Sequence, residues 1–86
     1  MEKKQLLGVA GSVESNDCLI TVTPSDEIKI HITSIVDAFF HEQIEKVILD
    51  VLKEENLTLE VTCQDKGALD YTIKARLLTA ISRMRG

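Results

Sequence analysis

The sequence of 86 residues has no tryptophan, one tyrosine and two phenylalanines, so aromatic residues make up 3% of the chain. A platform for single-stranded nucleic acid is therefore disfavoured, because it needs aromatic rings on which bases can stack. The chain also lacks an excess of cations, with 10 Lys and Arg against 14 Asp and Glu and a formal net charge of -4. Indiscriminate binding to phosphate backbones or anionic lipid needs the opposite balance, so the acidity favours basic protein partners.

Cysteine is scarce and no long hydrophobic run is present. Cys18 and Cys63 are too few and too far apart to form a disulfide framework, and neither has a second Cys or a His at metal-ligand spacing. We expect two buried or half-buried strand thiols and no metal site, with a disulfide as the alternative. Because no apolar run approaches the about 20 residues of a membrane span and no cleavable signal pattern follows the N-terminus, we expect a cytoplasmic protein without membrane contact.

Recognisable catalytic patterns are missing as well. The four glycines are scattered, which excludes a glycine-rich phosphate loop. His31 and His41 lie beside no candidate nucleophile and are interpreted as surface imidazoles. A chain of this size buries one core and has no second domain to close over a substrate. We therefore expect a single domain over residues 1–86 that serves as a carrier, an adaptor or a subunit of a larger assembly.

The hydrophobic periodicity predicts four strands and two helices. Alternation with a period of two, or a run of β-branched residues, marks strands over residues 6–13, 18–23, 28–33 and 57–64. A helical period runs from Ser34, which forms a capping pair with Asp37, through an apolar stripe that includes Phe40; it returns after Gly67 in a stripe that begins at Leu69. Pro24 is assigned to the second position of a turn between the second and third strands.

One apolar face on each element favours a two-layer arrangement. The order β-β-β-α-β-α predicts an α+β sandwich, in which a four-stranded sheet has both helices on one face and leaves the other face wet. The helix between the third and fourth strands allows these two strands to run parallel, which would make the sheet mixed. The strand order is left open by the sequence.

Two short segments carry the functional argument. Residues 14–17, Glu-Ser-Asn-Asp, favour a turn and predict a hairpin tip with Ser15 exposed. Residues 65–70, D-K-G-A-L-D, precede the second helix. In a purely structural interpretation Asp65 caps this helix, Gly67 eases its start, and Lys66 and Asp70 are surface charges of its first turn. Ser15, judged from the residues alone, is an ordinary turn serine.

Over nearly its whole length the chain resembles the acyl carrier protein (gamma subunit) family of citrate lyase. The resemblance rests on V-A-G-S-V-E-S-N-D over residues 9–17, V-I-L-D-V-L over 47–52 and D-K-G-A-L-D over 65–70. It implies a non-catalytic carrier subunit in which Ser15 is joined by a phosphodiester to 2'-(5''-phosphoribosyl)-3'-dephospho-CoA. The terminal thiol of this arm would hold acetyl and citryl groups while citrate is cleaved to oxaloacetate and acetate.

The same resemblance implies a set of partners. They are the alpha subunit (acyl transferase), the beta subunit (citryl-ACP lyase), a prosthetic-group transferase and an acetate ligase, with no nucleic acid and no membrane. Lys66 has a functional alternative here, as a partner for a phosphate of the arm or for another subunit. Gly11 and Ala10 either keep side-chain bulk low beneath the arm or pack in the core.

Two other functions stay open. One is the acyl carrier subunit of malonate decarboxylase, which resembles this family and uses the same prosthetic group. The other is an unmodified protein or nucleic-acid interaction module, because cations gather on the last helix. These cations are Lys74, Arg76, Arg83 and Arg85.

Overall fold

The computed structural model describes residues 6–34 and 38–86. Its elements follow in the order β1 (Gly8–Gly11), β2 (Cys18–Pro24), β3 (Lys29–Ser34), α1 (Ala38–Glu54), β4 (Leu59–Asp65) and α2 (Asp70–Arg85). The predicted α+β class and element order are thus confirmed. Neither helix of the described chain is long and apolar enough to cross a membrane.

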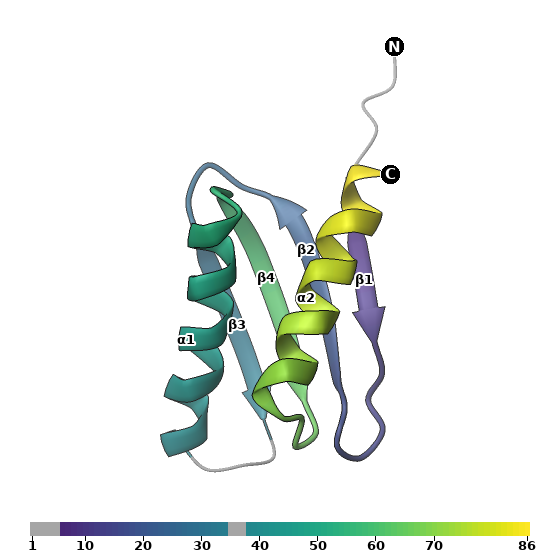
Figure 1. The fold of residues 1–86 in the computed structure, drawn as a ribbon, viewed down its shortest axis with the longest axis vertical. Coiled ribbons are helices and arrows are strands. Elements are labelled where there is room, and N and C mark those ends of the chain that lie inside the picture. Colours follow the sequence, from purple (N-terminus) through teal and green to yellow (C-terminus); the bar gives the residue numbers. More distant parts are fainter. Residues whose placement is uncertain (1–5, 35–37) are drawn as a thin grey trace.

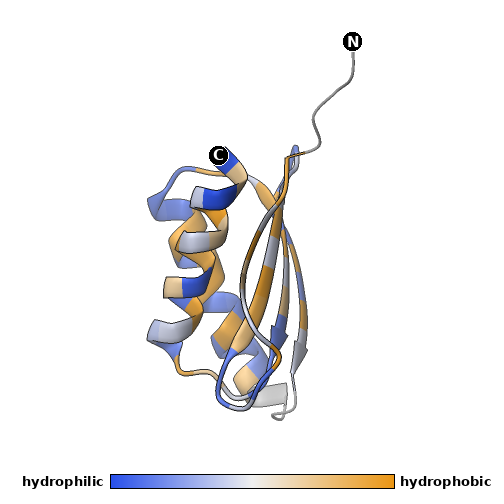
Figure 2. Cartoon of the chain, turned by 90° about the vertical axis from the view of Figure 1, so that its right-hand side faces the viewer, coloured by the Kyte–Doolittle hydropathy of each residue, from blue (hydrophilic) through white to orange (hydrophobic). Residues whose placement is uncertain are grey.

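The four strands form one mixed sheet in the order β1-β2-β4-β3 (Figure 1). β2 is antiparallel to both β1 and β4, whereas β3 and β4 run parallel, as the connecting helix α1 predicts. Figure 2 shows both helices on one side of the sheet. The bend between β1 and β2, the end of β3 and the turn between β4 and α2 all lie at one end of the molecule, the lower end in Figure 1.

The core lies between the sheet and the two helices. Inward side chains alternate along β2 and β4, where every second residue is buried. Ile48 and Leu52 of α1 and Leu77 of α2 are 0% exposed against these strands. The opposite face of the sheet is mainly polar and open to solvent, as predicted. Its exposed polar side chains include Lys29, His31, Thr33, Thr62 and Gln64.

Several element boundaries differ from the prediction. β1 ends at Gly11, which has a positive φ of 97°. Pro24 is the last residue of β2 and faces Leu59, so its assignment to the second position of a turn was wrong. Ser34 ends β3, and its predicted capping partner Asp37 lies outside the described residues.

Two apolar side chains assigned to the helix stripes are not buried. Leu69 is 59% exposed because it precedes α2 with an extended backbone (φ -77°, ψ 160°) and so does not follow the helical period. Phe40 is 50% exposed. It lies one helical turn before Ile44, near the N-terminal end of α1, where it lines a hollow together with residues 67–70. Helical periodicity thus predicted the two apolar stripes, but each predicted stripe included one residue that is not buried.

Candidate functional site

Ser15 lies at the corner of a tight turn between β1 and β2, as predicted. The turn is closed by the amide of Asp17, which donates to the carbonyl of Glu14 at 3.2 Å, so that Ser15 and Asn16 are its central residues. Asn16 has a φ of 64°, a conformation that asparagine tolerates better than most side chains. The Ser15 side chain is exposed. Its hydroxyl is therefore open to another protein.

The turn rests on a β-bulge formed with Lys66. The amide of Asn16 donates to the carbonyl of Lys66 at 2.8 Å, and the amide of Lys66 donates to the carbonyl of Asp17 at 2.9 Å. Two residues of one strand thus face one residue of the other, just beyond the pair Cys18–Asp65 that ends the β2–β4 ladder. Lys66 belongs to this bulge, so its assignment to the first turn of the second helix was wrong.

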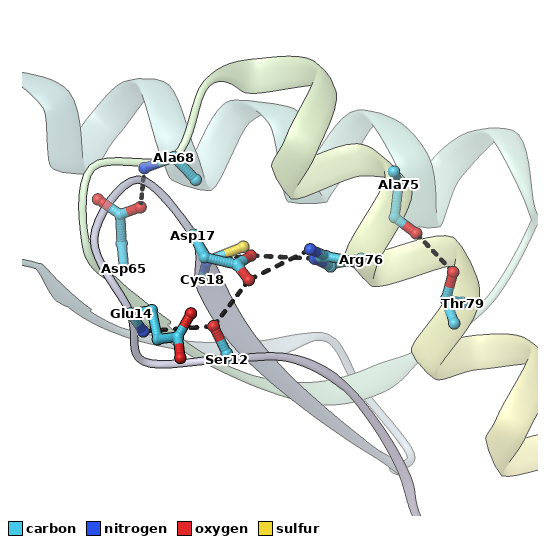
Figure 3. A network of polar contacts seen from close by, with 9 residues as sticks. All are labelled: Ser12, Glu14, Asp17, Cys18, Asp65, Ala68, Ala75, Arg76 and Thr79. Atoms are coloured by element: carbon cyan, nitrogen blue, oxygen red, sulfur yellow. Dashed lines mark hydrogen bonds and ion pairs between the residues drawn. The ribbon is translucent and has the colours of Figure 1, made fainter.

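Asp17 fastens the same turn to α2 (Figure 3). Its carboxylate accepts from Arg76 Nε at 3.0 Å and Arg76 Nη2 at 3.2 Å, from Ser12 Oγ at 2.8 Å and from the amide of Cys18 at 2.7 Å. The hydrogen bonds from Arg76, Ser12 and Cys18 lower the pKa of Asp17 to about 2. The ionised form of Asp17 is thereby favoured, and with it the fork-like pairing to the guanidinium.

Ala10 and Gly11 are the last two residues of β1, before the turn. A Cβ on Gly11 would lie 1.8 Å from the carbonyl oxygen of Cys18, whose oxygen also accepts the Ser12 amide at 3.1 Å. Ala10 is 2% exposed within the core. Ala10 therefore has the packing role that the sequence left open for it, whereas Gly11 is exposed and lies where the Cys18 carbonyl leaves no room for a side chain.

Asp65, the first residue of the second motif, is buried at the end of β4 and is 2% exposed. It accepts from Ser34 Oγ at 2.8 Å and from the amide of Ala68 at 2.9 Å. It thus caps the turn before α2, and the prediction that it caps the helix itself was wrong because Leu69 takes that position without a side-chain cap. Asp70 does lie in the first helical turn, where it accepts from Gln43 Nε2 at 2.8 Å.

The two cysteines are free and buried, as expected, and do not form the alternative disulfide. The hydrogen bond with Cys18 and the burial of the side chain raise the pKa of the Cys63 thiol. A protonated thiol without solvent access is a poor nucleophile. Cys63 is therefore part of the core and not a reactive group.

Other chemistry-bearing residues are spread over the surface. His31 Nε2 lies 2.8 Å from Glu60 Oε2 on the exposed sheet face, and His41 is exposed on α1. A hollow of about 170 Å³ beside the turn before α2 holds two carboxyl groups, those of Asp65 and Asp70, and both already accept hydrogen bonds. Within residues 6–34 and 38–86, no group of three or more His, Cys, Asp or Glu could hold a metal ion.

The cations on α2 are largely engaged within the chain. Arg76 pairs with Asp17, Arg83 donates to the carbonyl of Val9 at 2.8 Å, and Lys74 lies 4.0 Å from a carboxylate oxygen of Glu54. Phosphate backbones are bound by cations that are free to replace counterions. The arrangement therefore gives little support to a nucleic-acid interface on this helix.

The sequence did not reveal the role of Asp17 and Arg76. They are 59 residues apart, and no periodicity connects a turn with a helix over such a distance. The one available signal came from the family resemblance, which includes Asp17 in residues 9–17 and continues past residues 65–70 to Arg76 and Leu77.

Comparison with known proteins gives two family names, one from a family model and one from individual relatives. The family model described as malonate decarboxylase delta subunit (MdcD), an ACP family, matches residues 6–84. The citrate lyase acyl carrier protein of Streptococcus mutans is 48% identical in an alignment of 86 positions, which covers 96% of this chain and 83% of that protein. The one of Treponema denticola is 43% identical over 76 residues, which cover 87% of each chain.

The fold also matches a solved structure. A chain in a Pseudomonas malonate decarboxylase hetero-tetramer in complex with malonate superposes with a TM-score of 0.76, covering 93% of this chain and 84% of that chain. The two sequences are 17% identical, so the likeness concerns the fold alone.

Proposed function

This chain belongs to the citrate lyase acyl carrier protein family and has an acyl carrier role, and we propose that it works as the carrier subunit of a citrate lyase complex with Ser15 as its attachment residue. The proposed group is 2'-(5''-phosphoribosyl)-3'-dephospho-CoA, bound through a phosphodiester. Its terminal thiol supplies the thioester that holds acetyl or citryl. The observation that carries the proposal is the exposed hydroxyl of Ser15 at the corner of the turn.

The residues around Ser15 fit such an attachment. A hydroxyl that a separate enzyme modifies must be reachable, and Ser15 is exposed on a turn at the end of the sheet. Asn16 and Asp17 are held by Lys66 and Arg76, so the base of the turn is fixed while its corner stays open. The turn can thus present one defined hydroxyl to a loading enzyme.

The chain itself supplies reach and docking, and its partners supply the catalysis. We propose an alpha subunit with acyl transferase activity, a beta subunit that cleaves the citryl thioester, a prosthetic-group transferase and an acetate ligase as these partners. Anchoring the acyl group to Ser15 makes each transfer effectively intramolecular, with local concentrations of roughly millimolar for a short flexible link. A freely diffusing intermediate is thereby avoided.

The carrier of a malonate decarboxylase is the second candidate function. The description of the matching family model favours it. The relatives at 43% and 48% identity carry the citrate lyase name, which is why we place citrate first. Identification of the large subunits that co-purify with the chain decides between the two, because substrate choice lies in those subunits.

Replacement of Ser15 tests the attachment. The chain is produced with its loading enzymes as wild type, Ser15→Ala, Ser12→Ala and Ser82→Ala, and the intact mass of each is measured. We expect an added mass larger than phosphopantetheine on wild type and on Ser82→Ala, whose serine is exposed on α2. Ser15→Ala should gain nothing while its stability stays within about 0.5 kcal/mol of wild type, since an exposed turn side chain contributes little.

Loading of Ser15→Ala would refute the assignment. Loss of the added mass from a folded Ser12→Ala protein, with Ser15→Ala still loaded, would transfer the site to Ser12. Ser12 also hydrogen-bonds Asp17, so the thermal midpoint of that variant is recorded alongside its mass.

A further inference from the structure

The strand position of Lys66 brings it beside the attachment turn. Its backbone hydrogen-bonds both Asn16 and Asp17 across the bulge, at 2.8 and 2.9 Å. Paired strands lie about 4.8 Å apart, a distance shorter than an extended lysine side chain. Ser15 is the next residue along the chain from Asn16. An extended lysine side chain at position 66 is therefore long enough to bring its ammonium close to Ser15.

The carboxylates closest to Lys66 along the chain and across the bulge are already engaged. Asp17 accepts from Arg76, Ser12 and Cys18. Asp65 accepts from Ser34 Oγ and from the Ala68 amide and is 2% exposed. Across residues 6–34 and 38–86, the Lys66 ammonium makes no ion pair or side-chain hydrogen bond. Its backbone is held beside the turn, and its ammonium has no partner among these residues.

We infer that Lys66 is a binding residue for the phosphate bonded to the Ser15 oxygen, and that its ammonium pairs with the phosphate's unesterified oxygens. This inference rests on the proposed attachment at Ser15 and deepens it. A lysine binds phosphate as a compact point charge on a flexible side chain. This flexibility suits a phosphate on Ser15, because Ser15 is the neighbour of Asn16, the backbone partner of Lys66. The pairing draws the start of the arm toward the β2–β4 end of the sheet and offsets the repulsion between the phosphate and the exposed carboxylate of Glu14.

A phosphoserine at position 15 tests the contact independently of any loading enzyme. It places a phosphate on the same oxygen, as a monoester whose second pKa is ordinarily about 6. That pKa is measured by ³¹P NMR in the otherwise wild-type chain and in Lys66→Met, Lys66→Arg and Lys74→Met backgrounds. Lys74 is the matched control, an exposed lysine on α2.

We expect Lys66→Met to raise the phosphate pKa by about 0.6 unit, the effect of removing one cation about 5 Å away in water-like surroundings. The sign follows because a nearby cation favours the doubly charged phosphate. Lys66→Arg should keep the low value and Lys74→Met should leave it unchanged. The inference would be overturned if the phosphate pKa were the same in Lys66→Met and in the chain that keeps Lys66, provided that the amide NMR spectra show both proteins to be folded.

A second measurement separates the inference from the proposed function. The Lys66 pKa is followed through its ¹³Cε shift in the unloaded protein and in protein loaded by its own enzymes, with Lys74 as the internal reference. The Lys66 pKa should rise on loading, because a phosphate anion favours the charged ammonium, and the Lys74 pKa should not. Loading at Ser15 without a rise refutes the Lys66 contact alone, whereas loading at a different residue refutes the proposed function.

Discussion

At the scale of single residues, the geometry of the Ser15 turn depends on the ionised carboxylate of Asp17. Arg76, Ser12 and the Cys18 amide all donate to it, and together they tie three segments at one point. Ser15 itself makes none of these contacts in the described chain. The proposed attachment residue thus differs from the residues that position it, so a modification of Ser15 would leave the contacts of Asp17 in place.

The pKa of Asp17 predicts how the protein responds to acid. It is about 2 in the folded chain against an ordinary 3.8, so its contribution to stability is present above about pH 4 and is lost as the pH falls toward 2. We expect Asp17→Asn to be less stable than wild type at pH 7. Thermal midpoints measured from pH 6 to pH 2 should then converge, because only wild type loses this contribution.

The control for this prediction is Asp26→Asn, which changes an exposed aspartate in the turn between β2 and β3. Its midpoint should follow the wild-type curve through the same pH range. A constant difference between wild type and Asp17→Asn over the whole range would contradict the assigned role of the carboxylate.

At the scale of secondary-structure elements, α2 supports the turn that contains Ser15. It packs against β1 and β2, and its Arg76 reaches Asp17 from the helix surface. We predict that Arg76→Met leaves the fold intact but speeds hydrogen exchange at the Asn16 and Cys18 amides. Both amides lie in the segment that Asp17 ties to the helix.

Hydrogen exchange measured residue by residue checks this prediction. Arg85→Met, at the exposed end of the same helix, should leave exchange in the turn unchanged. Arg76→Lys should give an intermediate effect because a lysine cannot reproduce the two-pronged contact. Uniformly faster exchange throughout the chain in Arg76→Met would show a global loss of stability and would contradict a local tie.

Much of the element pattern could be predicted because it follows from local periodicity. The alternation around Val61 and the helical stripes through Ile48 in α1 and Leu77 in α2 are consequences of burying one face, and each was predicted from its own segment. The turn at Ser15 was also predicted, since its composition favours a turn regardless of context. The exposed Leu69 was not, because its surroundings are set by where α2 begins.

The tie between Asp17 and Arg76 shows the limit of such reasoning. It exists only once α2 lies across β1 and β2, and the residues that meet are 59 positions apart. The hydrogen bond from Ser34 to Asp65 belongs to the same class, because Ser34 comes from a neighbouring parallel strand 31 positions earlier. Contacts of this kind are set by tertiary packing, and a one-dimensional pattern contains no trace of them.

At the scale of the whole molecule, the hydrophobic core is separate from the end that contains the Ser15 turn. The two helices and the four strands enclose one core, while the turn between β1 and β2 and the turn between β4 and α2 lie together at one end (Figure 1). Such a shape suits a carrier, because partners can approach this end without disturbing the core. The proposed attachment at Ser15 would place the acyl arm on an exposed turn whose neighbouring residues are held by Lys66 and Arg76.

The most direct test of the central claim is peptide-level mass spectrometry of the chain isolated within its native, active complex. We predict that the peptide containing Ser15 carries the mass of a phosphoribosyl-dephospho-CoA group, with fragment ions that place it on the Ser15 oxygen. A fully active complex in which that peptide has its unmodified mass would contradict the account.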